Sequence, residues 1–328
     1  MMKAKATKIC FLVTVLSWLP AQLAGAATIS WTNTSGGNWS DTANWKPNQV
    51  PGPSDNVLIT SNGTYIVTQD VDATVASLTL GGMSGKQTLE NCGLTLTLTN
   101  ASSVNSNGIL NLCFGTLSGQ GLLTVRGRLD FTDRGTLNVP TRISGAMNWM
   151  AGTVGPAPLT IASNAVLTLG EWDDKLLYGA LTNAGTIQWT GSGRLFLNNN
   201  GTNTSGSIYN LAAGLFDIQN DQILCCYTVA LNNLDCGGFE LFDNAGTVRK
   251  SAGTGTSDFY IPFTNTGTVD VQSGSLSFNG GYSQTGGTLN FGISSRTSFG
   301  RINIAGNVAL TGSSATPNRS PIRPEHWR

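Results

Sequence analysis

The densest group of side chains that could do chemistry lies in "LGEWDDKLL", where Glu171, Asp173 and Asp174 flank Trp172. Two carboxylates are enough for glycoside hydrolysis, and a tryptophan beside them can form a sugar subsite. A pectate-lyase-like site would also need a basic residue, which Lys175 could supply. We favour a simpler interpretation, a polar loop in which Asp174 pairs with Lys175. Glu171, Asp173 and Asp174 are weak catalytic candidates, and Trp172 is a weak carbohydrate-binding candidate.

Other catalytic arrangements have less support. Asp217 and Asp221 in "FDIQNDQ" form a second and weaker acidic pair. The single histidine, His326, lies in the C-terminal tail, which argues against a Ser-His-Asp or Cys-His arrangement in the body of the chain. It also argues against histidine metal ligands. We therefore expect no metal site and no cofactor.

Five cysteines follow the N-terminal segment: Cys92, Cys113, Cys225, Cys226 and Cys236. An odd count argues against a fully paired disulfide framework, and the spacing does not fit zinc. Small buried or half-buried thiols are the favoured interpretation. Cys92 and Cys113 are separated by nearly one coil length, so they could be close enough for a disulfide. Leu110 and Leu112 predict conflicting facing for Cys113, so the disulfide state stays open.

The elements that must position these residues are short strands. Apolar and polar residues alternate in "LTLTLTN", "RLFLNNN" and "SLSFNGG", and Gly, Asn, Ser and Thr separate the runs. Period-two alternation over four to six residues indicates half-buried strands. The composition disfavours helices, because Gly, Ser, Thr and Asn have low helix propensity.

The turns between the strands repeat. "LTNAGTIQW", "FDNAGTVRK" and "FTNTGTVDV" share an Asn-small-Gly-Thr unit, and Gly246, Gly267 and Gly287 are about 20 residues apart. Repeats of this length, built from strands and turns, predict a solenoid. We interpret the repeated asparagines and glycines as corners with a left-handed backbone, where stacked asparagines could form a hydrogen-bonded ladder. A calcium or sugar site at each turn is the alternative, but the turns carry almost no carboxylates. The predicted corner residues are Asn183, Gly185, Asn244, Gly246, Asn265 and Gly267.

Three tryptophans, Trp31, Trp39 and Trp45, lie close together near the N-terminus and are followed by three prolines. Their spacing does not suit one strand face. We expect a folded cap that covers the first edge of the solenoid. A sugar-binding aromatic platform is the alternative.

The segment Met1–Ala26 has the pattern of a secretory signal peptide. Lys3, Lys5 and Lys8 precede an apolar run from Ile9 to Leu19, and Ala24-Gly25-Ala26 supplies small residues for cleavage. The apolar run is too short for a comfortable membrane span, and we expect no membrane span after cleavage. Charged residues make up 11% of the chain and the formal net charge is zero, so nucleic acid is not an expected partner.

The end of the chain departs from the repeat. "SSATPNRSPIRPEHWR" contains Pro317, Pro321 and Pro324, which cannot occupy a central strand. We predict a disordered tail and an exposed edge near Asn303 to Leu310 that favours self-association. The expected organisation is a signal peptide at 1–26, a cap with first strands at 27–70, a solenoid at 71–312 and a tail at 313–328. A disordered tail would fit a truncated or frameshifted version of a longer repeat protein.

Two stretches resemble known families. The "W…GNW…NW…P…D" opening resembles the start of secreted bacterial proteins with autotransporter-like β-strand repeats, and "LTNAGTIQW" with its copies is similar to a Gly-Thr-rich extracellular repeat. The resemblance implies an all-β, right-handed parallel β-helix of pectin-lyase-like shape at or outside the cell surface. It carries no catalytic residues. The expected function is a non-enzymatic structural or adhesive protein with glycans or envelope components as partners. A polysaccharide-binding or polysaccharide-degrading protein is the alternative.

Overall fold

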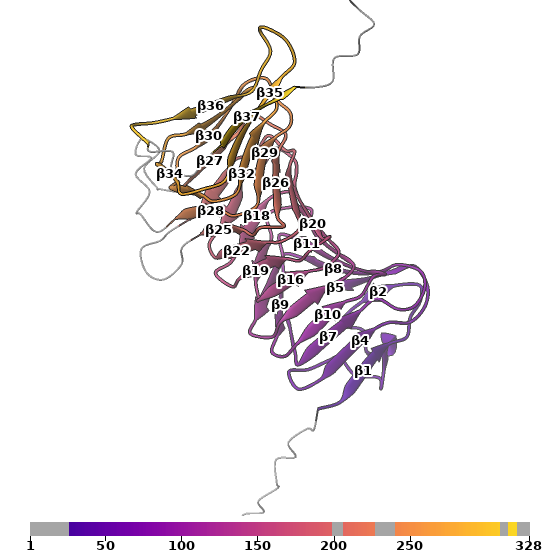
Figure 1. The fold of residues 1–328 in the computed structure, drawn as a ribbon. Helices are drawn as coiled ribbons and strands as arrows, with labels where there is room; N and C mark the ends of the chain where they lie inside the picture. Colours follow the sequence, from indigo (N-terminus) through magenta and orange to yellow (C-terminus); the bar gives the residue numbers. More distant parts are fainter. Residues whose placement is uncertain (1–25, 199–205, 227–239, 309–313, 320–328) are drawn as a thin grey trace, which may run out of the picture.

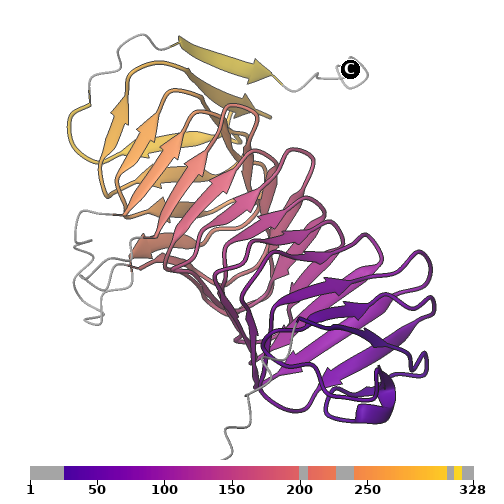
Figure 2. The ribbon, with the colours of Figure 1, turned by 90° about the horizontal axis from the view of Figure 1, so that it is seen from below.

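Alternating burial runs through almost every strand of the protein. In "TLTL" at Thr95–Leu98 the two leucines are buried and the two threonines are half-buried. Strands of this kind build an all-β parallel solenoid in the computed structural model, which describes residues 26–198, 206–226, 240–308 and 314–319. The prediction of an all-β solenoid is confirmed. Its coils stack into an elongated column with the N-terminal coils at one end and the C-terminal coils at the other (Figures 1 and 2).

Three sheets form the walls of the column, and each complete coil after the N-terminal one contributes one strand to each sheet. Sheet A contains β1 (Thr28–Trp31), β3 (Trp45–Lys46), β4 (Asn56–Ile59), β7 (Ser77–Leu80), β10 (Ser102–Val104), β13 (Leu123–Val125), β16 (Thr141–Ile143), β19 (Leu159–Ile161), β22 (Ala180–Asn183), β25 (Ser207–Asn210), β28 (Leu241–Asn244), β31 (Phe263–Asn265) and β34 (Tyr282–Gln284). Sheet B contains β2 (Gly37–Asn38), β5 (Tyr65–Gln69), β8 (Gln87–Cys92), β11 (Gly108–Cys113), β14 (Arg128–Phe131), β17 (Ala146–Trp149), β20 (Val166–Leu169), β23 (Thr186–Trp189), β26 (Leu215–Ile218), β29 (Thr247–Lys250), β32 (Thr268–Val271), β35 (Thr288–Ile293) and β37 (Ser314–Arg319). Sheet C contains β6 (Ala73–Val75), β9 (Thr95–Leu98), β12 (Thr116–Gly119), β15 (Thr136–Asn138), β18 (Gly152–Val154), β21 (Lys175–Leu177), β24 (Leu195–Leu197), β27 (Ile223–Cys226), β30 (Thr256–Phe259), β33 (Ser275–Phe278) and β36 (Arg301–Ile304).

Register aligns like residues from coil to coil. Leu117 lies opposite Leu96 on one side and Leu137 on the other, and all three are buried. Because side chains alternate across a strand, the inward columns form one apolar core along the column. The residues between them point outward on the three faces.

The first coils carry the cap. Antiparallel pairing of β3 with β1 closes the first edge of sheet A, and a short 3-10 helix, η1 (Thr42–Asn44), precedes β3. Parallel pairing begins within this cap region, because β4 pairs in parallel with both β1 and β7.

The prediction of a disordered tail is wrong for Ser314–Arg319. This segment forms β37, which pairs in parallel with β35 and places Pro317 opposite Phe291. A proline is compatible here because β37 is the last strand of sheet B, where one side of the strand needs no ladder donors. Residues 320–328, with His326, and residues 1–25 of the predicted signal peptide lie outside the described residues.

Candidate functional site

The acidic loop predicted from "LGEWDDKLL" connects β20 to β21 at the corner between sheets B and C. Glu171 is exposed and has a φ of 55°, and the Trp172 side chain is 70% exposed. The structure therefore brings the predicted residues together on the surface. Their partners, however, differ from those expected.

The expected pair between Asp174 and Lys175 is wrong. Asp174 instead forms an ion pair with Arg194 on the next coil, with 2.7 Å between Oδ2 and Nη2, and it also accepts a 2.8 Å bond from the Arg194 backbone N–H. Burial raises the pKa of Asp174, but the hydrogen bonds from Arg194 outweigh it, so this pKa is lowered overall. A general acid needs the opposite shift.

Asp173 has a looser partner on the surface. The Arg134 guanidinium lies 3.4 Å from its Oδ1, and the Arg134 side chain is 65% exposed. An exposed pair of this kind contributes little stability. Asp173, Arg134 and the exposed Trp172 indole therefore form a small polar and aromatic surface rather than an enclosed catalytic pocket.

Lys175 turns inward from this loop. Its side chain is fully buried, and Nζ donates to the carbonyl oxygens of Gly170 and of Asp173, the latter at 2.6 Å. Burial lowers the pKa of Lys175 to about 8, against the opposing charges of Asp174, Asp173 and Glu171. An amine with this pKa could act as a base, but a substrate cannot reach it here. It holds the corner in shape instead.

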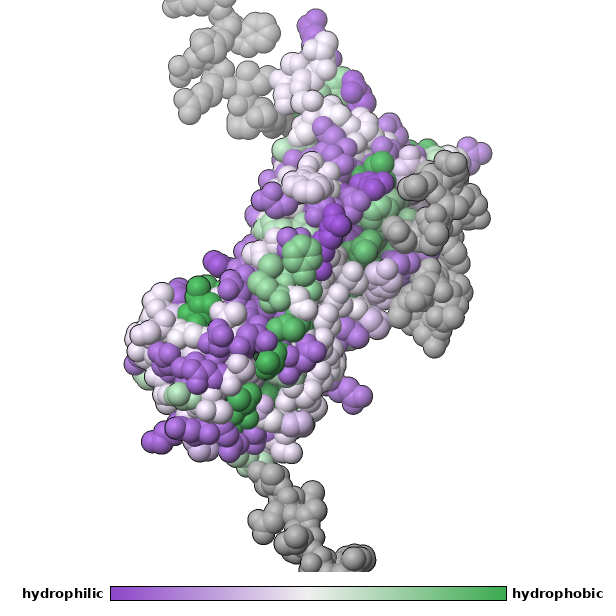
Figure 3. All heavy atoms as spheres, turned by 180° about the vertical axis from the view of Figure 1, so that it is seen from behind, coloured by the Kyte–Doolittle hydropathy of each residue, from purple (hydrophilic) through white to green (hydrophobic). Residues whose placement is uncertain are grey.

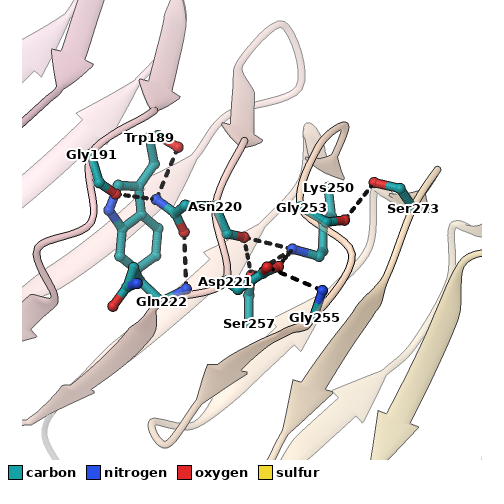
Figure 4. Close-up of polar contacts among 10 residues, drawn as sticks. All are labelled: Trp189, Gly191, Asn220, Asp221, Gln222, Lys250, Gly253, Gly255, Ser257 and Ser273. Atoms are coloured by element: carbon teal, nitrogen blue, oxygen red, sulfur yellow. Dashed lines mark hydrogen bonds and ion pairs between the residues drawn. The ribbon is translucent and has the colours of Figure 1, made fainter.

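A second buried lysine occupies the same kind of corner three coils further along (Figure 4). Lys250 Nζ donates to the carbonyl oxygen of Asn220 at 2.5 Å, to Asp221 Oδ1 at 2.7 Å and to Ser257 Oγ at 3.0 Å. Asp221 also accepts a bond from the Gly255 backbone N–H. Asp221, a weak catalytic candidate, thus serves to anchor a buried cation between neighbouring coils.

Asn220 extends this network toward the preceding coil. Its Nδ2 donates to the carbonyl oxygens of Trp189 at 3.0 Å and Gly191 at 2.7 Å (Figure 4). One amide and one lysine therefore connect three successive coils. The Trp189 carbonyl oxygen also accepts the Gln219 backbone N–H at 2.9 Å, so the side chains add to the backbone hydrogen bonds at these bends.

Sequence reasoning missed a row of charged residues on sheet B. Arg249 lies in register between Asp217 and Asp270, and its Nε is 3.0 Å from Asp217 Oδ1. Gln219 and Gln272 donate to the two aspartates at 2.8 and 2.9 Å. The signal that could have found this row is the repeated Asp-x-Gln in "FDIQN" and "VDVQS".

This row does not offer accessible carboxylates. Asp217 is 3% exposed and Asp270 is 9% exposed, although both belong to outward columns. Burial raises the pKa of Asp217, but hydrogen bonds from Arg249, Ser251 and Gln219 lower it overall. The geometry suits a structural ion pair between coils better than sugar cleavage.

The predicted corner asparagines lie at the ends of sheet A strands and point into the core. Nδ2 of Asn183 donates to Oδ1 of Asn210 at 2.8 Å, Asn210 donates to Asn244 at 2.8 Å, and Asn244 donates to Asn265 at 2.7 Å. Each of the four side chains is at most 1% exposed. The result is a buried amide ladder across four coils, which includes Asn210, a residue absent from the predicted corner set.

The predicted left-handed backbone at Gly185, Gly246 and Gly267 is wrong. These glycines follow the ladder asparagines at the corners, but none has a positive φ. Glycine is needed there for space. A Cβ at Gly246 would lie 2.3 Å from the carbonyl oxygens of both Gly214 and Leu211, and one at Gly267 would lie 2.1 Å from the carbonyl oxygen of Gly246. The backbone of one coil rests directly on the corner of the coil before it.

The three N-terminal tryptophans are buried, each at most 1% exposed. Trp45 packs edge-on against Trp31 and Trp39 with ring centroids 4.9 Å apart in both pairs. Its Nε1 donates to the carbonyl oxygen of Trp39 at 2.7 Å. A sugar platform needs exposed rings, so the alternative of an aromatic platform is contradicted, and the indoles plug the end of the core.

The cysteines fall into different environments. Cys92, Cys113 and Cys225 are free, whereas Cys226 is disulfide-bonded. Burial raises the pKa of Cys225 to about 11. Cys236 lies outside the described residues. Within the described ranges, no group of three or more metal-ligating side chains gathers at one place.

This chain can be assigned to a class of protein by its fold. Among the described residues, no helix has the length and apolar character needed to cross a membrane. Comparison with protein-family models, with curated proteins and with solved structures finds no match. The chain is therefore defined by its architecture, as a parallel β-solenoid repeat protein.

Proposed function

We propose that this is a non-enzymatic extracellular or cell-surface repeat protein, structural or adhesive, that contacts its partner through rows of hydroxyl groups on its faces. We also propose that the chain is related to the autotransporter-like and Gly-Thr-rich secreted repeat proteins that its sequence resembles. The signal-peptide pattern of Met1–Ala26 supports secretion.

The observation that carries the proposal is a row on sheet C. Thr95, Thr116, Thr136 and Thr153 lie in register on four successive strands, and all are half-buried. The leucines beside the first three are buried, so these threonines point outward. Neighbouring strands are about 4.8 Å apart, so the hydroxyl groups repeat at that interval.

A second row runs beside the first. Thr97, Ser118 and Asn138 are in register, and the hydroxyl groups of Thr97 and Ser118 are 3.0 Å apart. The two rows give an uncharged lattice of hydrogen-bond donors and acceptors on sheet C. The molecular surface seen from behind is mostly pale or purple, with strongly apolar residues in the minority (Figure 3). A regular polar lattice suits an extended ligand such as a glycan chain, because a repeating polymer can meet several coils at once.

Binding of the purified mature chain to insoluble glycans tests the proposal. We expect Thr116→Glu with Thr136→Glu to abolish retention on a binding glycan. The matched control is Thr160→Glu with Thr182→Glu, an in-register pair of half-buried threonines on sheet A. Equal retention of both double variants would remove sheet C as the contact surface. Release of reducing sugars by the unaltered chain would overturn the non-enzymatic proposal.

One observation favours the alternative of polysaccharide binding at the acidic loop. Trp172 is 70% exposed, whereas the other tryptophans of the described chain are buried. An exposed indole beside polar groups can stack on a sugar ring. If this alternative holds, Trp172→Ala should abolish glycan binding while the sheet C variants keep it. Loss of product release in Asp173→Ala and Asp174→Ala would identify a degrading enzyme.

A further inference from the structure

Cys92 and Cys113 are neighbours on adjacent coils. They are the last residues of β8 and β11, and they lie directly opposite each other in sheet B. In-register residues on parallel strands have Cα atoms about 4.8 Å apart. This distance falls within the range of about 4.4–6.8 Å that a disulfide spans.

Both thiols face the same side of the sheet. Asn91 and Leu112, the residues before them, are fully buried, so Cys92 and Cys113 point outward. The expected conflict in facing is thus removed, because Leu112 and Cys113 alternate as strand neighbours should. Cys92 is exposed and Cys113 is half-buried.

The backbone around the pair holds the two cysteines next to each other. Gly93, which follows Cys92, has a φ of 80°, and no atom outside its chain neighbours lies within 4 Å of a Cβ built on it. Phe114, which follows Cys113, has a φ of 56° and is 57% exposed. Phe114 also forms a bridge with Cys92, and the Gly93 backbone N–H donates to the carbonyl oxygen of Cys113 at 2.8 Å. The two strand ends are therefore held side by side, with Cys92 on the exposed side of the turn.

We infer that Cys92 and Cys113 are a dithiol site that closes into a reversible cross-coil disulfide by exchange with a small-molecule disulfide. One cysteine thiolate attacks the external disulfide, forms a mixed disulfide and releases one small thiol. The second cysteine thiolate then attacks the protein sulfur of that mixed disulfide and releases the other small thiol. The two protein thiols are oxidised, the external disulfide is reduced, and the two cysteine protons end on the released thiols.

The remaining free thiol among the described residues provides a built-in contrast. Cys225 is 4% exposed, and its strand neighbour across the ladder is Phe196 rather than a cysteine. Burial, the hydrogen bond with Cys113, and the charges of Cys113 and Glu90 raise the pKa of Cys92 to about 12. Exchange at the pair should therefore quicken as the pH rises, since the thiolate is the nucleophile.

The test uses the purified mature chain exposed to oxidised glutathione at about pH 8 and then alkylated without reduction. Cys92 and Cys113 share one tryptic peptide, Gln87–Arg126, because no lysine or arginine lies between them. We expect this peptide to lose two hydrogens and both alkylation sites. Chymotryptic cleavage between the two cysteines should then release linked fragments. Limited dithiothreitol should restore both thiols.

Cysteine variants distinguish a disulfide between Cys92 and Cys113 from independent reactions of single thiols. Cys92→Ser and Cys113→Ser should each lose the cross-link and keep one glutathione on the remaining cysteine. Cys225→Ser should form the cross-link as the unaltered chain does. Two stable glutathione adducts on the unaltered peptide, or two freely alkylated thiols after the treatment, would overturn the inference. Circular dichroism of each variant checks that the sheets are intact.

Discussion

Replacing Gly246 with alanine is expected to destabilise the solenoid by about 3 kcal/mol or more. The new Cβ would lie 2.3 Å from two carbonyl oxygens, those of Gly214 and Leu211, and real Cβ contacts are essentially never below 3.0 Å. Both oxygens belong to the backbone of the preceding coil, so no flexible side chain can move aside. The coils must separate by several tenths of an ångström along ladder bonds such as Thr247 N–H to the carbonyl oxygen of Gly214, at 2.9 Å.

Two matched substitutions isolate the cause. Gly93→Ala tests a positive φ without crowding and should destabilise by about 1 kcal/mol, while Gly286→Ala tests neither and should stay within about 0.5 kcal/mol. Urea unfolding followed by circular dichroism gives the free energies. Hydrogen exchange of the β28 and β29 amides shows whether the loss is local, because a solenoid can unfold in segments.

Asparagine in place of Gly246 provides the decisive comparison. If the position needed a left-handed backbone, asparagine would be tolerated better than alanine. If it needs space, asparagine should be at least as damaging, because its Cβ meets the same oxygens. Near-normal stability of Gly246→Ala would refute the close-contact explanation.

Three further outcomes are expected. Asn244→Ala should destabilise by about 3 kcal/mol in urea unfolding, because Asn265 Oδ1 and the Thr268 carbonyl oxygen both lose their Asn244 donor, while Asn210 Nδ2 loses one acceptor and keeps the Gly214 and Thr247 carbonyl oxygens. Asn265→Ala at the end of the ladder should destabilise by about 1 kcal/mol, because Asn244 Nδ2 keeps its bond to the Thr268 carbonyl oxygen. Equal losses would contradict the ladder. The pKa of Lys175 is about 8 in the native chain against an ordinary value of 10.5, so between these two pH values the unfolded chain holds a proton that the native chain has released. The free energy of unfolding of the unaltered chain, compared with that of Lys175→Met, should therefore rise with pH across this range by at most about 3 kcal/mol. A difference that stays constant with pH would refute the assignment. In the described chain β34 ends sheet A and β36 ends sheet C, and each leaves one strand edge unpaired, so we predict concentration-dependent association in sedimentation velocity. Ile302→Lys on β36 should weaken this association, and deletion of Ser313–Arg328 should not reduce it. A strictly monomeric chain would contradict the prediction.

The strands could be predicted from sequence because their signal is local. In "TLTL" and "SLSF" the alternation of side chains that defines a strand is complete within a single short run. The repeated Asn-small-Gly-Thr unit then indicates stacking, since each copy begins a similar coil. The class of fold follows from these two patterns.

The role of the corner glycines could not be predicted in the same way. Whether Gly246 is needed for its φ or for space depends on the coil beneath it, at Leu211 and Gly214, which is distant in the sequence. Asn210 was missed for a related reason. The ladder steps from Asn183 to Asn210 and from Asn210 to Asn244 span 27 and 34 residues, longer than the 21 residues from Asn244 to Asn265.

The charged partners show the same limit. Reasoning from neighbours in the chain paired Asp174 with Lys175, but the partner of Asp174 is Arg194, 20 residues later and one coil along. A parallel ladder brings together residues that are about one coil apart in sequence, whereas residues next to each other in a strand point to opposite sides of the sheet. Lys175 accordingly turns to the core, while Asp174 stays at the surface.

The proline-rich end illustrates a rule applied too broadly. Pro317 excludes a central strand, but β37 is an edge strand, and an edge tolerates a missing donor on its open side. Composition alone does not distinguish these two cases. Whether a proline is tolerated depends on whether its strand lies at the edge or in the middle of the sheet, and this is known only from the sheet order.

The polar side chains divide between two tasks. The asparagine ladder fixes the corner between sheets A and B through buried amides on neighbouring coils. At corners between sheets B and C, buried Lys250 bonds to the preceding coil, and buried Lys175 holds two carbonyl oxygens of its own loop. Such contacts penalise a slip in register, because moving one residue along would leave a buried amide or cation without its partner. Among the described residues, the outward threonine column of sheet C carries no such buried ion pair or amide ladder. A threonine such as Thr116 can change without disturbing the stack, so a partner can be recognised there while the corners keep the coils aligned. This is why we look for function on the faces and not in the clusters of charge.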